Sequence, residues 1–508
     1  MNKFFQSTSN QLLLIIILAL TVRLYKINNT VLDWHAWRQA DTASVTREYT
    51  KKGIDLLHPT YHDLSNIPNF LDNSQDGYRM VEFPIINALV ALILKIMPNL
   101  DLVTTSRFIS VALSLGTLTA LYYLVKKISS EKLALLSALT FALLPFSIYY
   151  SRVVLPEPAV LLFSTSSLCF FAYYLKKEKF NFYVLSVLTL AVAFLLKPFV
   201  AFLIPVYLVL AYQKFKNKIF FKPQLYLFAL LGIIPFILWR YWIQQYPEGI
   251  PDSDWLFNST GIRFRPAWFR WLFYERLTKL ILGFTGIIFF LANLLKLKTK
   301  EVQIYAAWWL GIIIYFSVIA TGNVRHDYYQ VLLIPIICIS VARGALILFE
   351  LIKKVIQNLK FHLKVSFIPA EFFFKNSGSE IKINNYAQPL SVVIISLLLL
   401  ISLLLSWKQI KGYYQLNHFE YRSCGQEVDK LTPKDAKIIA HAMGDTQFLF
   451  QTNRTGWPIG FEIEDKIAKG ATHYATTSFD DEAKRLEKQY ETIEKTNSCL
   501  ILNLQKSK

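Results

Sequence analysis

The stretch from Asp33 to Glu82 carries the side chains best suited to chemistry, in a chain that is otherwise largely apolar. Two of its carboxylates stand out: Asp41 in WRQADTASVTREY and Glu82 in GYRMVEFPIINAL. A run of acids directly after a hydrophobic segment is not needed to hold a protein in a bilayer, whereas a carboxylate at the membrane–water boundary can serve as a general base. We therefore interpret this stretch as an active-site loop.

Both carboxylates also have structural interpretations. If residues 38–52 are helical, Arg38, Asp41 and Glu48 share one face, and Arg38–Asp41 is then an ion pair on a solvated helix, worth about 0.5 kcal/mol. Glu48, in turn, is expected to tolerate replacement by Gln. Glu82 precedes Pro84, where a carboxylate suits the N-terminus of a second short helix. The sequence leaves these alternatives open.

A second set of polar residues lies in short turns between apolar runs. Its members are Arg152, Glu157, Lys197, Arg325, His326 and Tyr328. A lysine at a membrane boundary is unfavourable unless it snorkels to water or is paired. The functional alternative for Lys197, Arg152 and Arg325 is a set of cations that receive a phosphate. His326 is open to three interpretations: a metal ligand, a hydrogen bonder to phosphate, or an interfacial residue.

The segment RFRPAWFRWLFYER adds Arg265 and Arg270 among aromatic residues. Such interleaving is typical of interfacial anchoring, and the same chemistry can hold an anionic lipid headgroup. Both interpretations stay open.

The composition predicts a membrane protein. Of 508 residues, 54% are hydrophobic and only 18% are charged, against about 25% in soluble domains. The net charge of +19 does not indicate nucleic-acid binding, because the lysines lie in short loops between apolar runs, where the positive-inside rule accounts for them. The four cysteines show no zinc-site spacing.

The elements that would position these residues are about eleven membrane-spanning helices. They are predicted at 10–27, 101–125, 131–150, 156–175, 181–196, 198–212, 223–242, 277–297, 302–321, 329–350 and 386–407. Two further helices, within 38–52 and 83–97, are expected to lie along the interface inside a first outer loop, 28–100. Lysine-rich loops alternate along the chain, which predicts a cytoplasmic N-terminus and places the loop and the C-terminus outside.

Residues 408–508 differ in composition and predict a small extracytoplasmic α/β domain after the membrane domain, 1–407. Cys424 and Cys499 flank this domain, whereas Cys169 and Cys338 lie within apolar segments. Because disulfides are permitted outside the cytoplasm, we expect a Cys424–Cys499 bond.

The order of these parts resembles the GT-C glycosyltransferases, over roughly 1–410. They include the dolichyl-phosphate-mannose protein mannosyltransferases, the bacterial aminoarabinose transferases of lipid A and the rhizobial lipopolysaccharide core sugar transferases. RQADTASVTREYTKKG resembles their first-loop helix, which would make Asp41 the catalytic carboxylate, and YRMVEFPIINAL resembles their second, which places Glu82 at an acidic position. SRVVLPEPAVLLF, LLKPFVAF and RHDYYQVLLIP resemble recurrent outer-turn motifs.

Two departures from that pattern matter. Asp41-Thr42 stands where many relatives have Asp-Glu, and Glu82-Phe83 stands where some have Glu-Lys. The phosphate-binding lysine of that second motif is therefore missing, and Lys197, Arg152 or Arg325 would have to supply its charge.

The resemblance implies transfer of a sugar from a polyprenyl-phosphate donor to an envelope lipid, glycan or protein on the outer face of the cell (inner) membrane, with inversion. The sequence establishes no cofactor, and a divalent metal held by Glu82 or His326 stays open. The alternatives are a transporter or flippase of lipid-linked envelope precursors and a structural scaffold. A transporter predicts ionisable residues in mid-membrane or paired broken helices, whereas here the charges cluster at outer ends.

Overall fold

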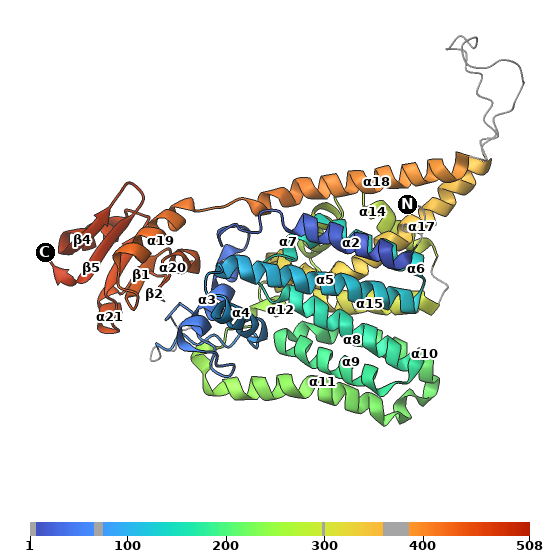
Figure 1. Cartoon of the computed structure of the whole chain (residues 1–508), viewed down its shortest axis with the longest axis horizontal. Helices are drawn as coiled ribbons and strands as arrows, with labels where there is room; N and C mark the ends of the chain where they lie inside the picture. Colours follow the sequence, from blue (N-terminus) through green and yellow to red (C-terminus); the bar gives the residue numbers. More distant parts are fainter. Residues whose placement is uncertain (1–6, 66–74, 297–299, 359–385) are drawn as a thin grey trace, which may run out of the picture.

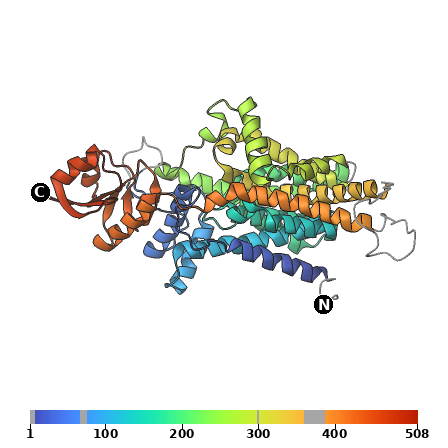
Figure 2. The same ribbon diagram turned by 90° about the horizontal axis from the view of Figure 1, so that it is seen from above.

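The computed structural model describes residues 7–65, 75–296, 300–358 and 386–508. A long helical bundle and a small sheet domain lie end to end, and the first loop, with its two helices, lies between them (Figures 1 and 2). Residues 66–74 of the predicted outer loop 28–100 fall outside the described residues. The structure is thus polytopic and α-helical with a C-terminal α/β domain, as the sequence predicts.

Seven helices among the described residues are long and apolar enough to cross a membrane. They are Leu102–Ile128, Glu157–Lys177, Pro198–Phe221, Pro223–Gln245, Lys300–Val318, Asp327–Asn358 and Ala387–Leu431. Each of them overlaps one predicted segment. The other four predicted segments are helical too, but they form shorter or interrupted helices.

Local sequence explains those four. The helices α2 (Thr8–Arg23) and α9 (Phe180–Leu196) have 16 and 17 residues, which at 1.5 Å per residue is shorter than a ~30 Å hydrocarbon core. The predicted helix 131–150 divides into α6 (Glu131–Leu143) and α7 (Pro145–Tyr150), because Pro145 holds Leu144 in an extended conformation. The predicted helix 277–297 is broken between η5 (Arg270–Ile281) and α14 (Ile287–Ala292), where Gly283 has a φ of +53°.

The bundle contains further helices, joined by short turns. They are α5 (Leu102–Ile128), α8 (Glu157–Lys177), α10 (Ile204–Phe215), α11 (Pro223–Trp242), α12 (Trp255–Asn258), α13 (Pro266–Phe269), α15 (Lys300–Val318), α16 (Ala320–Arg325), α17 (Ile334–Asn358) and α18 (Ala387–Ile410), with the short turns η1 (Pro198–Leu203), η2 (Lys216–Phe221), η3 (Ile243–Gln245), η4 (Pro247–Gly249), η6 (Asn293–Leu295), η7 (Asp327–Leu333) and η9 (Lys411–Tyr414).

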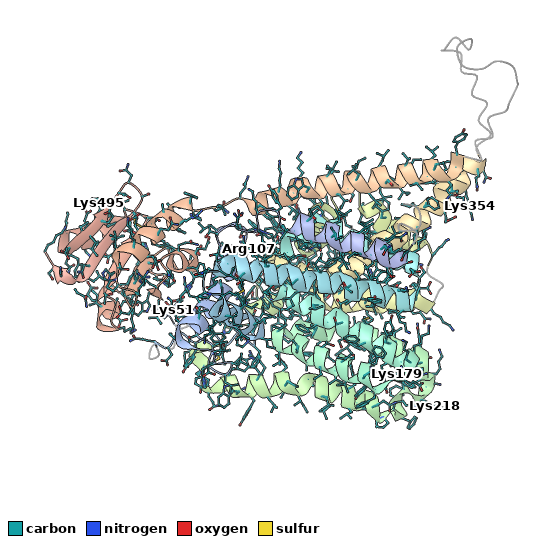
Figure 3. All side chains as sticks on the ribbon, in the orientation of Figure 1. Lys51, Arg107, Lys179, Lys218, Lys354 and Lys495 are labelled. Atoms are coloured by element: carbon teal, nitrogen blue, oxygen red, sulfur yellow. A yellow bond between two sulfur atoms is a disulfide. The ribbon has the colours of Figure 1, made fainter. Side chains whose placement is uncertain are left out.

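Lysines of the bundle mark one of its ends. Lys179, Lys218 and Lys354 lie at the end remote from the sheet domain (Figure 3). This distribution agrees with the alternation of lysine-rich loops along the chain, because all three lysines belong to loops or helix ends that are predicted to share one side of the membrane.

The two predicted loop helices are present as α3 (Ala36–Lys52) and α4 (Ile85–Ile96). Helix α3 is not the solvated helix of the structural alternative, because twelve of its residues are buried, Arg38, Asp41 and Glu48 among them. Glu48 is 1% exposed and pairs with Lys52 at 3.0 Å, so it is no neutral control position. Helix α4 exposes Leu89, Leu92 and Ile96 along one side, as an interfacial helix does.

The C-terminal domain is a five-stranded mixed sheet in the order β2-β1-β3-β5-β4. Its strands are β1 (Lys437–His441), β2 (Thr455–Trp457), β3 (His473–Thr476), β4 (Tyr490–Lys495) and β5 (Leu500–Ser507), with helices α19 (Phe419–Leu431), α20 (Thr446–Gln451), α21 (Ile463–Ala468) and α22 (Asp481–Gln489). β1 pairs in parallel with β2 and β3, and β5 is antiparallel to both β3 and β4. The predicted Cys424–Cys499 disulfide is confirmed, with Cα atoms 5.2 Å apart.

The first loop extends this sheet. Gly456 of β2 donates its N–H to the His62 carbonyl at 2.9 Å and accepts from the Leu64 N–H at 2.8 Å, so residues 62–64 run beside β2. A Cβ on Gly456 would lie 1.8 Å from the Ile438 carbonyl oxygen, which explains a glycine here. The loop is thereby fixed between the bundle and the sheet.

Candidate functional site

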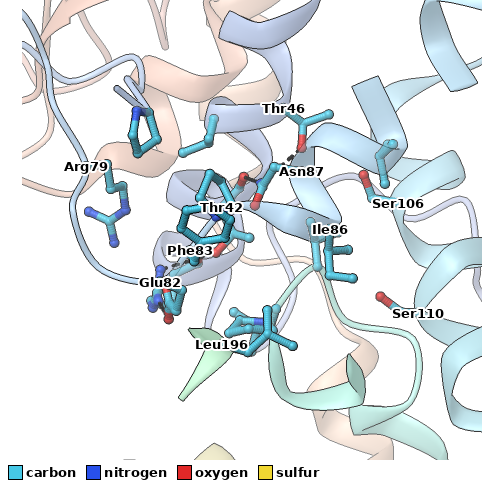
Figure 4. Close-up of a pocket in the computed structure, with 18 residues that line it drawn as sticks. Thr42, Thr46, Arg79, Glu82, Phe83, Ile86, Asn87, Ser106, Ser110 and Leu196 are labelled. Carbon is cyan, nitrogen blue, oxygen red and sulfur yellow. Dashed lines mark hydrogen bonds and ion pairs between the residues drawn. The ribbon is translucent and has the colours of Figure 1, made fainter. Parts of the chain in front are cut away.

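A cavity with both polar and apolar walls, here called the outer pocket, lies between the first loop and the ends of the bundle helices nearest the sheet domain (Figure 4). It encloses about 610 Å³, part of which is open to solvent. Polar side chains from α3, α4, α5 and the segment before α4 face it: Arg38, Thr42, Thr46, Arg79, Glu82, Asn87, Ser106 and Ser110. Apolar walls with a few convergent polar groups are typical of a small-molecule site.

Arg38 and Glu82 form an ion pair at this pocket. Burial alone would raise the pKa of Glu82, but the attraction of Arg38 and Lys197 and the hydrogen bond from Arg38 outweigh it and lower that pKa. Glu82 is therefore ionised at neutral pH. It is placed for holding charges and hydroxyl groups rather than for taking up a proton.

Asn87 ties the two loop helices together. Its side-chain amide donates to the Thr42 carbonyl at 2.7 Å and to Thr46 Oγ1 at 3.1 Å (Figure 4). The Phe83 N–H bonds to the Leu195 carbonyl at the end of α9 at 3.1 Å. These bonds fix Glu82 beside the turn that carries Lys197.

A second, largely apolar cavity, here called the tail groove, holds Lys197. It encloses about 300 Å³, and its apolar walls include Val160, Leu161, Phe199 and Leu332. Lys197 pairs there with Glu157, the first residue of α8, and its ammonium group lies 5.4 Å from the ring centre of Tyr328. Lys197 is thus paired inside the protein rather than snorkelling into headgroups, because its side chain is only 12% exposed.

Asp41 lies behind the outer pocket, against the C-terminal domain. Arg79 Nη2 is 3.0 Å from its Oδ2, Thr446 Oγ1 donates to its Oδ1 at 2.7 Å, and His62 Nε2 is 3.9 Å from Oδ1. Arg79 also lines the outer pocket, so it separates Asp41 from that space. The Arg38–Asp41 ion pair considered from the sequence is replaced by Arg38–Glu82 and Arg79–Asp41.

Arg152 has a different environment from the one expected of a phosphate ligand. It is 1% exposed, and its Nη2 donates to Asp33 Oδ2 at 2.6 Å, an oxygen that Arg107 also contacts at 3.0 Å. Gln39 donates to the other oxygen of Asp33 at 2.8 Å. This buried cluster joins the first loop to α5 and α7, and it leaves Arg152 no access to either cavity.

The turn 325–328 divides its residues between surface and interior. Arg325 is exposed and stands 5.8 Å from the ring centre of Trp255. The His326 ring stacks on Tyr328 at 5.3 Å, and burial lowers its pKa to about 4. Asp327 is buried, accepts hydrogen bonds from Tyr150 at 2.6 Å and Trp34 at 3.2 Å, and lies 2.5 Å from His35 Nε2.

The roles expected of Asp41, Glu82, Lys197 and Arg325 would need one shared cavity, but the four residues occupy separate places. Glu82 lines the outer pocket, Lys197 the tail groove, Asp41 the junction with the sheet domain, and Arg325 the surface. Arg265 and Arg270 are exposed as well, and Arg270 lies 3.7 Å from Glu275.

The residues named for a metal do not gather. Among the described residues, no group of three or more His, Cys, Asp or Glu could hold a metal ion, and Glu82 faces Arg38 instead. Glu82 and His326 therefore do not belong to a donor set that fits a divalent ion.

Several residues of the site are not among the candidates that the sequence indicates. Arg79 and Asn87 lie within the motif YRMVEFPIINAL, on either side of Glu82, so their nearness in the chain was a usable signal. Tyr329 lies within RHDYYQVLLIP, whereas His62 carries no distinctive pattern. Thr446 lies 405 positions from Asp41, and nothing in the local sequence announces their contact.

The comparison with solved structures decides the fold. ArnT from Cupriavidus metallidurans, bound to undecaprenyl phosphate, superposes with a TM-score of 0.62 at 13% identity, covering 96% of this chain and 97% of that one. The chain has the GT-C fold. The Archaeoglobus fulgidus oligosaccharyltransferase AglB, in complex with an inhibitory peptide and a dolichol-phosphate, matches this GT-C chain with a TM-score of 0.55 at 11% identity, over 99% of this chain and 75% of its own.

Sequence comparisons agree with this fold over part of the GT-C chain. The family described as dolichyl-phosphate-mannose-protein mannosyltransferase matches residues 82–242. An uncharacterized protein of Aquifex aeolicus (strain VF5) is 28% identical over 235 residues, which is 44% of this chain and about half (51%) of that protein. The resemblance to the GT-C glycosyltransferases is confirmed.

Proposed function

We propose that this protein is a glycosyltransferase that moves a sugar from a polyprenyl-phosphate donor to an envelope lipid, glycan or protein acceptor. One observation carries the proposal: a pocket lined by two arginines and a carboxylate adjoins an apolar groove that holds a paired lysine. The two cavities match the two chemical halves of a lipid-linked sugar, and solved relatives of the same fold bind undecaprenyl phosphate or dolichol-phosphate.

The tail groove suits the lipid phosphate and the first isoprene units. Lys197 is paired with the Glu157 carboxylate, and Glu157 Oε2 has no hydrogen-bond partner. A phosphate is a stronger partner for a buried ammonium group than one carboxylate, since it offers more acceptor oxygens. Phosphate entry would therefore take Lys197 from Glu157, while Tyr328 and Tyr329 cover the same space.

The outer pocket suits the sugar. Glu82, held ionised by Arg38, and the Asn87 amide supply acceptors and donors for the sugar's hydroxyl groups. The positive charges of Arg38 and Arg79 stabilise the negative charge that develops on the leaving phosphate. Arg152, Arg325, His326, Arg265 and Arg270 have no place in this arrangement, because they are buried elsewhere or lie outside both cavities.

Asp41 is the base in the proposed step. The acceptor oxygen or nitrogen attacks the anomeric carbon, its proton passes to Asp41 Oδ2, and the carbon–oxygen bond to phosphate breaks with its electron pair on the phosphate oxygen. A single displacement of this kind inverts the anomeric centre. Arg79 now covers Oδ2 at 3.0 Å. A donor phosphate gives Arg79 a second anionic partner, so donor binding would uncover the base.

Transfer on the outer face of the cell membrane is part of the proposal. Lys179, Lys218 and Lys354 lie at the end of the bundle opposite the loop, and basic residues favour the cytoplasmic side (Figure 3). A reporter that is active only outside the cytoplasm, fused after Lys508, is expected to be active. A stable but inactive fusion contradicts this orientation.

The deciding experiment compares a strain lacking the gene with its parent. Mass spectrometry is expected to show an accumulated polyprenyl-phosphate sugar and an envelope lipid, glycan or protein that lacks that sugar. The purified chain should restore the sugar when it is added to the mutant's envelope fraction with the accumulated lipid. Identical lipid-linked sugars and envelope glycans in both strains would refute the proposal.

A further inference from the structure

His62 is a buried histidine whose environment fixes its tautomer. It is fully buried on the loop strand that pairs with Gly456, and Arg47 Nη2 lies 3.1 Å from its Nδ1. An arginine can only donate, so Nδ1 must accept, and the single proton of the neutral ring sits on Nε2. Burial and the nearby cations Arg47, Arg79 and Lys51 lower the pKa of His62 well below its usual value, which keeps the ring neutral.

The guanidinium group of Arg47 is itself held in place. Its Nη1 donates to the Phe450 carbonyl at 2.8 Å, and its guanidinium lies 4.3 Å from the Phe450 ring centre. The backbone of His62 is held by Gly456 and that of Tyr61 by Gly77 at 2.8 Å. Turning the imidazole over would therefore break its contact with Arg47.

The protonated nitrogen faces Asp41. His62 Nε2 stands 3.9 Å from Asp41 Oδ1 and has no hydrogen-bond partner, although it is buried. This separation is about 1 Å longer than an N–H···O hydrogen bond. A buried donor without a partner is rare in native proteins, and it calls for a function or for a second arrangement in which it is used.

We propose that His62 is a positioning residue for Asp41: its Nε2–H holds Oδ1, beside the Thr446 hydroxyl, once Arg79 leaves Oδ2. The inference rests on the proposed function of Asp41 as the base. Without Arg79, Asp41 keeps only the Thr446 bond at Oδ1. A second donor on that oxygen fixes the carboxylate plane and leaves Oδ2 as the free basic oxygen.

The first test measures turnover and donor affinity separately. His62→Phe keeps the ring and removes the donor, and His62→Gln restores an N–H near the Nε2 position. With the full-length protein, undecaprenyl phosphate mannose and glucose as donors and the mutant strain's envelope fraction as acceptor, His62→Phe is expected to lower kcat roughly tenfold to hundredfold with donor KM unchanged, and His62→Gln to recover part of it. His441→Phe is the matched control, since His441 is also buried and contacts Asp480 at 3.1 Å.

Wild-type kcat in His62→Phe, or equal losses in both His62 variants that follow their thermal stability, would overturn the inference. A second test needs no activity: ¹⁵N chemical shifts of the histidine rings, with His62→Gln for assignment, should show His62 neutral with its proton on Nε2. A proton on Nδ1, or a charged ring at pH 7, would also overturn it. A wild-type protein that transfers no lipid-linked sugar would instead count against the proposed function, and the tautomer test would still stand.

Discussion

The Lys197–Glu157 pair offers the sharpest test of the donor site, because its two members should act in opposite directions. Lys197→Met leaves Glu157, whose side chain is 7% exposed, as a buried carboxylate without its partner. Breaking one side of a buried pair costs about 3–5 kcal/mol of stability. It also removes a charged contact to phosphate worth about 1.5–3 kcal/mol, which is about ten- to 150-fold in Kd.

Glu157→Gln has the opposite effect on the ligand. It removes the carboxylate that competes with phosphate for the ammonium group, so undecaprenyl phosphate should bind more tightly while the unliganded protein is destabilised. The double variant Lys197→Met/Glu157→Gln lacks both charges of this pair. It should therefore regain most of the stability lost by Lys197→Met. It should not regain phosphate affinity.

Two measurements on the purified full-length chain separate these effects: thermal unfolding with and without undecaprenyl phosphate, and the Kd of undecaprenyl phosphate by titration. The informative protein is the double variant, because it is expected to be stable. If the double variant binds undecaprenyl phosphate as tightly as the wild type, Lys197 does not hold the donor phosphate. The Lys197–Glu157 pair then only stabilises the fold around the tail groove.

Three other expectations concern single features. Asp41→Asn should fold and bind undecaprenyl phosphate but transfer sugar at least about a hundredfold more slowly, with the exposed Asp252→Asn as control; wild-type transfer by Asp41→Asn refutes the mechanism. Burial raises the pKa of Asp63 to about 7, so its contribution to stability is full below pH ~4 and is lost as pH rises to about 7. Asp63→Asn should therefore unfold with a weaker pH dependence between these values, by at most about 4 kcal/mol, in thermal scans. Replacing Cys424 and Cys499 by Ala should lower the stability of the sheet domain by about 4 kcal/mol, measured by hydrogen exchange in the full chain; unchanged protection of β1 and β3 contradicts it.

The helical part of the fold was predictable because a bilayer requires long apolar runs. The seven long spans follow that rule, whereas α6 and α7 required attention to Pro145, which breaks an otherwise continuous apolar run. The C-terminal domain and its disulfide followed from composition and from the placement of Cys424 and Cys499. Register along the sheet, and the pairing of loop residues 62–64 with β2, depend on tertiary contacts that local patterns do not contain.

The candidate site was predictable only in part, for an electrostatic reason. Residue types identified which charges lie at outer helix ends, but not which charges neutralise one another. Arg152 satisfies the buried Asp33, and Arg38 turns to Glu82 instead of Asp41. Pairing depends on which groups share a low-dielectric interior, and that is decided when distant segments pack. His62 and Thr446 became visible only in three dimensions.

The hydrogen bond between Thr446 and Asp41 has a consequence for how the protein is made. Asp41 leaves the ribosome with the first loop, whereas Thr446 follows 405 residues later, after the last membrane helix. Until the C-terminal domain has been made and folded, the carboxylate lacks its Thr446 partner and the loop segment 62–64 lacks β2 beside it. Chains that terminate early would carry every proposed donor contact of the membrane domain and still have an incomplete base, so unfinished copies in the membrane would not consume lipid-linked sugar.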